Sequence, residues 1–157
     1  MAHRLVVWEW LYKADQDFGF AKTTFESEQP YYDQICFMFQ QAAEKYLKAF
    51  VVGRKLKFTK THDLVELLEI CSAGDEKLRV LRPKCDFLDG FYIEPRYPDE
   101  KFVVTTKDQA KEALVAAEAV QVEIRKKLGV SGEVTEEMVR SENEKVEEEM
   151  KKLDEEK

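Results

Sequence analysis

The stretch that decides the fold is residues 35–53, ICFMFQQAAEKYLKAFVVG. Apolar residues recur in it at intervals of three and four, which is the period of an α-helix. One apolar line contains Ile35, Phe39, Ala42, Tyr46 and Ala49, and a second contains Cys36, Ala43, Leu47, Phe50 and Val51. Because the apolar arc is wide, we expect this helix to be central and the most buried. Pro30 suits its first turn, and Gly53 is expected to cap its end.

The segments on either side carry the same period. Residues 7–25 have one apolar line, made of Val7, Leu11, Ala14, Phe18, Ala21 and Phe25. Residues 64–71 form a short amphipathic stretch that Thr61 can cap, and Pro83 predicts a kink or break in the stretch that starts at residue 75. Thr106 and Gln109 have the spacing of a capping box, which opens a helix that Gly129 closes.

No segment alternates between apolar and polar residues between turn signals, so the predicted class is all-α. Five helices with short connections indicate an up-and-down antiparallel bundle of about five helices, over residues 1–130. Residues 131–157 follow as an acidic, charged helical or flexible tail, whose apolar residues are sparse. We expect this C-terminal extension to be solvated, frayed or dependent on a partner.

Composition and charge exclude several classes of protein. The chain has 157 residues, of which 44% are hydrophobic, enough for one core. It has no long apolar run and no signal-like start, which predicts a cytoplasmic protein without a membrane segment. The formal net charge is −7, and residues 133–157 hold 11 acidic and 5 basic side chains, so duplex DNA is not an expected partner. Cys36, Cys71 and Cys85 are far apart in sequence and are expected to pack in the core, with no metal and no cofactor implied.

The connector after residue 53 is the first candidate site. It holds Arg54, Lys55, Lys57 and Lys60, followed by His62. His62 is expected in the first turn of the next helix, where free N–H groups attract an anion, and it can donate to a phosphate or serve as a general acid–base. The alternatives are a solvated basic loop and a histidine that packs beside Asp63 and helps to cap the helix.

The connector at residues 94–99, EPRYPD, is the second candidate. Arg96 presents a planar fork of donors that suits bidentate contact with phosphate, and Tyr92 or Tyr97 can stack on a base. The alternative is that Arg96 pairs with Glu94 or Asp99 and fastens the loop to the bundle. If both connectors meet, their cations form one anion-receptive pocket.

Three runs together resemble the HEPN domain family, named for nucleotide-binding proteins of higher eukaryotes and prokaryotes. They are FQQAAEKYLKA at residues 39–49, THDL at 61–64 with Leu67 and Leu68, and the segment from Leu88 and Asp89 through RYPD at 96–99. The resemblance covers residues 5–128 and leaves the tail outside. It implies a small helical bundle, commonly a homodimer, often paired with a minimal nucleotidyltransferase.

The resemblance implies a nucleotide-binding subunit for ATP, GTP or RNA, acting with that nucleotidyltransferase in a two-component, toxin–antitoxin-like system. The implied alternative is a metal-independent endoribonuclease toxin that uses His62 with Arg54 or Arg96 and a 2′-hydroxyl as nucleophile. Many toxin members have four to six residues between an arginine and a histidine, whereas seven separate Arg54 from His62 here. A second alternative is a non-catalytic dimeric helical adaptor.

Three further predictions concern single side chains. Asp15 interrupts the apolar side of the first helix and is expected at the surface, although it can also face a pocket or a cation. Glu44 and Lys48 have the spacing of a structural i,i+4 ion pair. Trp8 and Trp10 point to different faces, and the chain has further large apolar residues in Phe37, Met38, Phe87 and Phe91. This excess predicts a homodimer with one tryptophan at the subunit interface.

Overall fold

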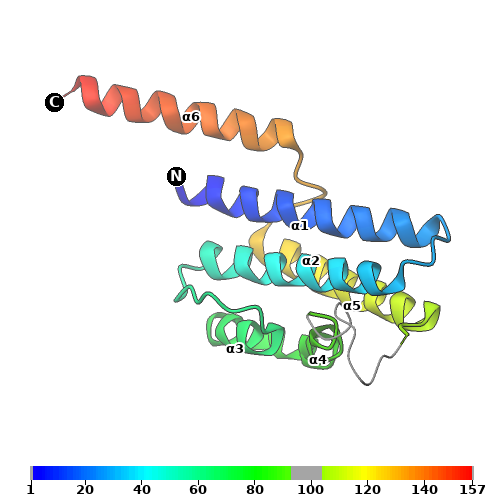
Figure 1. Ribbon diagram of the computed structural model, residues 1–157. Coiled ribbons are helices and arrows are strands. Elements are labelled where there is room, and N and C mark those ends of the chain that lie inside the picture. Colours follow the sequence, from blue (N-terminus) through cyan, green and yellow to red (C-terminus); the bar gives the residue numbers. More distant parts are fainter. Residues whose placement is uncertain (1, 93–103, 157) are drawn as a thin grey trace.

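The computed structural model describes residues 2–92 and 104–156, and every regular element in that part of the chain is helical (Figure 1). The elements are α1 (Ala2–Glu26), α2 (Tyr32–Gly53), α3 (Leu64–Gly74), the 3-10 helix η1 (Glu76–Leu81), α4 (Arg82–Asp89), α5 (Lys107–Leu128) and α6 (Glu136–Glu155). The prediction of an all-α helical bundle is confirmed.

The predicted central helix is α2, which contacts α1, α3, α4 and α5. In Figure 1 it lies between α1 on one side and α3 and α4 on the other, with α5 alongside. Phe39, Tyr46 and Phe50 on this helix are fully buried. Three polar residues on the same helix, Gln40, Glu44 and Lys48, are also almost completely buried, which positions the site described below.

Local capping signals set the ends of α5 as predicted. Thr106 and Gln109 form the expected capping box, because the Thr106 side chain accepts from the Gln109 N–H and the Gln109 side chain accepts from the Thr106 N–H. Gly129 follows the helix with φ of 68°, a left-handed conformation that glycine adopts without steric cost. These short-range patterns need no tertiary partner, so the sequence predicts them well.

Two predicted helix boundaries are corrected. Pro30 lies before α2, whose N-cap is Tyr31, so the proline is outside the first turn. Gly53 is the last residue of α2 and not a left-handed cap; Lys55 takes the positive φ, at 55°. A Cβ on Gly53 would lie 2.6 Å from Leu128 Cδ2, so the glycine allows α5 to end close against α2. Pro83 starts α4 and thereby breaks the predicted stretch after η1.

The expected surface position of Asp15 is wrong. Asp15 is 4% exposed and accepts hydrogen bonds from Tyr46 Oη at 2.5 Å, the backbone N–H of Val134 at 2.9 Å and the Arg125 guanidinium. Gln121 Nε2 donates to Tyr46 Oη at 2.7 Å. The carboxylate faces a cation that lies 110 residues away in the sequence, which is why local periodicity did not find it.

The three cysteines pack in the core, as predicted. Cys36, Cys71 and Cys85 are free thiols with no exposed surface, and burial is the main cause that raises the pKa of each to about 12. They are therefore protonated, weakly reactive thiols that fill space. Within residues 2–92 and 104–156, no group of three or more histidine, cysteine or carboxylate side chains is arranged so that it could hold a metal ion.

The tail forms a helix, α6, which begins on the outer side of α1 (Figure 1). Val134, just before this helix, is fully buried in the main core, and Met138 and Val139 pack against that core. The tail is therefore anchored at its start. Among the helices of the described residues, none has the length and apolarity that crossing a membrane requires.

Candidate functional site around His62

The connector between α2 and α3 folds back along α2. The Leu56 N–H donates to the Val51 carbonyl at 2.9 Å, and the Phe58 ring then packs on Trp10 of α1 with centroids 6.0 Å apart. This return path carries His62 back to the middle of α2. The Gln40 side chain fixes the backbone there, because its Nε2 donates to the His62 carbonyl at 3.2 Å.

The His62 side chain is held on one edge and one face. Its Nδ1 lies 2.8 Å from Glu44 Oε1, and its ring stacks on Tyr92 with centroids 4.8 Å apart and planes at 20°. The side chain is nevertheless 55% exposed. Since Nδ1 is occupied by the carboxylate, Nε2 is the ring nitrogen that remains for a ligand.

Glu44 is a buried carboxylate shared by two cationic or donor groups. It is 4% exposed, and its second oxygen, Oε2, lies 3.1 Å from Lys48 Nζ. The predicted Glu44–Lys48 pair is therefore present, and His62 extends it into a line of three groups. A carboxylate on Nδ1 fixes the orientation and tautomer of an imidazole, and it stabilises the imidazolium that forms when Nε2 takes up a proton.

Aromatic rings surround the lysine of this line. Lys48 is 6% exposed, and its Nζ lies 5.7 Å from the Trp10 ring centroid and 5.9 Å from the Phe58 ring centroid. Both distances are within the range of cation–π attraction. Lys48 therefore serves mainly to balance the Glu44 charge, because its ammonium is enclosed by the carboxylate and the two rings.

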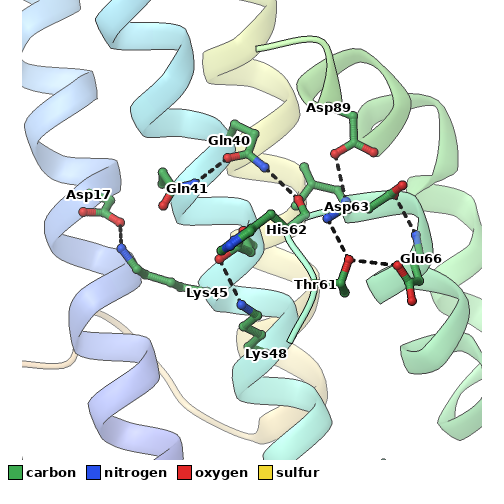
Figure 2. A network of polar contacts seen from close by, with 12 residues as sticks. Asp17, Gln40, Gln41, Lys45, Lys48, Thr61, His62, Asp63, Glu66 and Asp89 are labelled. Atoms are coloured by element: carbon green, nitrogen blue, oxygen red, sulfur yellow. Dashed lines mark hydrogen bonds and ion pairs between the residues drawn. The ribbon is translucent and has the colours of Figure 1, made fainter. Parts of the chain in front are cut away.

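A second ion pair, Lys45 with Asp17, borders the site on the α1 side (Figure 2). Gln41 Nε2 donates to Gln40 Oε1 at 2.7 Å, which orients the amide that holds the His62 backbone. Together these contacts make one face of α2 polar, between its two apolar lines. They fix the position of His62 relative to both α1 and α2.

The start of α3 differs from the expected anion site. His62 precedes the helix, Asp63 is the N-cap in place of Thr61, and its side chain accepts from the Glu66 N–H at 3.0 Å. The N–H groups of Leu64 and Val65, expected to be free, donate to the Asp89 carboxylate at 2.8 and 3.2 Å. The protein therefore supplies its own anion to this helix N-terminus.

The surroundings of Asp89 partly disfavour the charged form of its carboxyl group. Burial, the largest cause, raises its pKa to about 6, and the neighbouring Asp63 carboxylate adds to the rise. The two backbone donors at the start of α3 act in the opposite direction. Asp89 therefore changes its charge in a pH range where an ordinary aspartate is fully ionised.

The basic residues of the connector do not all stay near His62. Arg54 donates through Nη2 to the Lys127 carbonyl at 2.6 Å, at the end of α5, and lies over the Phe50 ring. It follows Glu44 by ten residues, about 15 Å along the helix. Lys55, Lys57 and Lys60 are exposed on the connector. This geometry does not favour Arg54 as the partner of His62.

Arg96 and Tyr97 lie outside the described residues, so their predicted roles stay predictions. Tyr92, which was predicted to stack on a base, is described, and it stacks on the His62 ring. Tyr92 is the last described residue before the segment that contains Arg96 and Tyr97.

Sequence reasoning missed Glu44, Gln40 and Asp17 as parts of this site. The available signal was the spacing of Gln40, Glu44 and Lys48, which recur every four residues between two apolar lines. A narrow polar line on a helix that is otherwise buried must find polar partners from other elements, because unpaired buried charges are costly. The partner itself, His62, could not be named from that spacing.

Comparison with known proteins agrees with this fold. The HEPN domain family model matches residues 7–128, and this chain belongs to the HEPN domain family. Family membership supports a nucleotide-binding or ribonuclease-type function at the level of the family.

The structure is also similar to a solved one. The crystal structure of ST0689, an archaeal HEPN homologue, aligns with a TM-score of 0.64 and 22% sequence identity, covering 78% of this chain and 97% of that chain. At this identity the likeness supports the fold alone. No curated protein matches the sequence significantly.

Proposed function

We propose that this chain is a nucleotide-binding subunit in which His62 contacts the phosphate of ATP, GTP or RNA. The observation that supports it is the Nδ1 contact of His62 with the buried Glu44 carboxylate, at 2.8 Å, on a side chain that is 55% exposed. When Nε2 of a histidine oriented in this way carries a proton, it is a charged hydrogen-bond donor, and such donors bind phosphate oxygens well.

The exposed lysines Lys55, Lys57 and Lys60 support an anionic ligand in this proposal. They lie on the same connector as His62, on a chain whose net charge is negative overall. Clustered cations raise the local concentration of an anion even where the whole molecule repels it. In the proposal, Arg96 and Tyr97 add a phosphate contact and a stacking surface, as the sequence predicts.

Equilibrium binding of fluorescent ATP and GTP analogues tests the proposal. His62→Ala is expected to weaken binding about tenfold, which corresponds to the loss of one charge-assisted hydrogen bond. Arg96→Ala is expected to act in the same direction. Lys111→Ala, which removes an exposed lysine on α5, is the matched control and should bind as the wild type does. Equal affinity of His62→Ala and the wild type would remove His62 from the site.

The proposed protein partner is a minimal nucleotidyltransferase, in a two-component, toxin–antitoxin-like system in the cytoplasm. The argument comes from the family resemblance, because HEPN chains are often paired with such an enzyme. The test is co-expression with a nucleotidyltransferase encoded beside this chain, followed by size-exclusion chromatography of the mixture. Separate elution of the two proteins, with and without ATP, would contradict the pairing.

The second candidate function is a metal-independent endoribonuclease, and the His62–Glu44 contact favours it specifically. In that reaction Nε2 of His62 takes the proton of an RNA 2′-hydroxyl, and the 2′-oxygen bonds to phosphorus. The bond from phosphorus to the 5′-oxygen breaks, and the His62 imidazolium returns the proton to that oxygen. The Glu44 carboxylate stabilises the His62 imidazolium that exists after Nε2 has taken up the 2′-hydroxyl proton. Arg96 is the proposed cation for the phosphate, since Arg54 lies at the end of α5.

Cleavage of a single-stranded RNA in the presence of EDTA distinguishes the two functions. Ribonuclease activity predicts a 2′,3′-cyclic phosphate product, no cleavage of a matched 2′-deoxy substrate, and a loss of at least about a hundredfold in His62→Ala. Nucleotide binding without any RNA cleavage would support the function as a nucleotide-binding subunit and exclude the function as a ribonuclease. A chain that neither binds nor cleaves would fit the third alternative, a dimeric helical adaptor.

The apolar residues first considered for the proposed homodimer are at least partly covered by the core. Trp8, Trp10, Met38 and Phe87 are partly buried against the core, and Phe91 is 7% exposed. Among the exposed apolar residues, Val80, Val115 and Val122 lie together on η1 and α5. Sedimentation velocity measures the mass directly, and a dimer is the expected result.

A further inference from the structure

The last part of α6 extends past the bundle. The linker to α6 is held at Asp15, and from there α6 passes along α1 toward Ala2, which is 13 residues or about 20 Å away. The 20 residues of α6 span about 30 Å, so its final turns pass the start of α1. Figure 1 shows α6 continuing beyond the end of α1 that is labelled N.

Apolar residues recur on α6 in a coiled-coil pattern. Val139, Val146 and Leu153 are spaced by seven, and Asn143 and Met150 lie between them at intervals of three and four. These are the d and a positions of a heptad repeat. Met138 and Val139 pack against the core at the start of the helix, whereas Met150 is 61% exposed and Leu153 is 60% exposed. The apolar face is thus covered at one end only.

The positions that flank this exposed face are all acidic. Glu149 and Glu156 occupy the g positions, and Glu147 and Asp154 occupy the e positions. In a parallel pair of two such helices g faces e, and in an antiparallel pair like positions face each other, so either arrangement opposes carboxylates. Like charges in such positions destabilise a helix pair. A second copy of α6 is therefore a poor partner.

We propose that the α6 face formed by Val146, Met150 and Leu153 docks a basic amphipathic helix of another protein. Lysine or arginine at the partner's e and g positions complements the four carboxylates, and apolar residues at its a and d positions cover Met150 and Leu153. The family match ends at residue 128, so this surface is additional to the HEPN unit and independent of His62.

The test uses the full chain and a designed probe, a three-heptad peptide with leucine at d, valine at a and lysine at e and g. A matched peptide with glutamate at e and g is the control probe. Fluorescence anisotropy is expected to show binding of the lysine peptide only, weakened by raising the salt concentration. The double variant Met150→Ser, Leu153→Ser should weaken binding about tenfold or more, because it removes two apolar side chains from the contact.

Two controls separate this surface from other effects. The double variant Glu144→Ser, Lys151→Ser changes the opposite side of α6 and should bind the lysine peptide as the wild type does. His62→Ala should also bind normally, whatever its effect on nucleotides. Equal binding of both peptides, no binding of either, or unchanged binding by the Met150 and Leu153 variant would each overturn the proposal. So would a loss of self-association on changing Met150 and Leu153, since the occupant would then be a second copy.

Discussion

Asp15 accepts hydrogen bonds from three parts of the chain, which are α2, α5 and the linker before α6. Its side chain is 2% exposed and that of Arg125 is 17% exposed, so this ion pair is largely removed from water. Burial and the nearby Asp15 carboxylate raise the pKa of Tyr46, which keeps that hydroxyl a donor. Removal of Asp15 therefore leaves a cation and a backbone N–H without their acceptor.

Asp15→Ala is expected to lower the free energy of unfolding by about 3 kcal/mol, the cost of leaving one member of a buried pair uncompensated. Urea unfolding followed by circular dichroism measures this change. Asp86→Ala is the matched control, because Asp86 is exposed and pairs with Arg82 on its own helix at 3.3 Å. The control should change stability by less than about 0.5 kcal/mol. Similar losses in the two variants would contradict a special role for Asp15.

Asp89 gives a pH-dependent prediction. Its pKa is raised from 3.8 to about 6, mainly by burial, so the folded chain binds the proton more tightly than the unfolded chain. Stability contributed by this group is therefore greatest at low pH and declines as the pH rises from about 4 to about 6. Relative to Asp89→Asn, the wild type should lose unfolding free energy across this window, measured by urea titration at each pH. Parallel curves for the two proteins would show that Asp89 does not titrate differently on folding.

At the scale of residues, short-range relations are predictable and tertiary ones are not. The Glu44–Lys48 pair follows from a spacing of four on one helix. The contacts of His62 with Glu44 and of Asp15 with Arg125 join residues 18 and 110 positions apart, and only the packing of helices creates them. The sequence therefore identifies His62 as a candidate, while its carboxylate partner comes from the structure.

At the scale of elements, two glycines with open surroundings should respond oppositely to alanine. Gly129 has φ of 68° after α5, where a Cβ strains the backbone, and Gly19 lies inside α1, where alanine has the higher helix propensity. Gly129→Ala is expected to destabilise the protein by about 1 kcal/mol, and Gly19→Ala to stabilise it by about 0.5 to 1 kcal/mol. Thermal unfolding measures both, and shifts of the same sign would contradict the conformational argument.

Helix ends show where sequence rules suffice. Thr106, Gln109 and Gly129 were predicted correctly, because each acts on backbone groups within its own helix end. Gly53 was predicted as a cap and instead makes room for Leu128. A glycine near a helix end has two possible reasons for its presence, conformation and close approach, and the sequence alone does not separate them.

At the scale of the whole molecule, the boundary of the folded unit is testable. The predicted division at residue 130 leaves Val134 outside the bundle domain, yet Val134 is fully buried in the main core. A chain that ends after residue 130 should therefore lose about 2 kcal/mol or more of stability relative to the full chain. A chain that ends after residue 146 should lose less than about 0.5 kcal/mol, because only exposed turns are removed. Equal stability of the two truncated chains would support the predicted end of the bundle domain at residue 130.

The hydrogen bond from the Val134 N–H to Asp15 attaches the segment just before α6 to a buried carboxylate of α1. The same carboxylate also accepts from Tyr46, on the helix that carries Glu44. One carboxylate therefore holds both the start of the tail and the buried tyrosine of the central helix. Loss of this acceptor would release residue 134 from the interior and leave the Tyr46 hydroxyl without the carboxylate to which it donates.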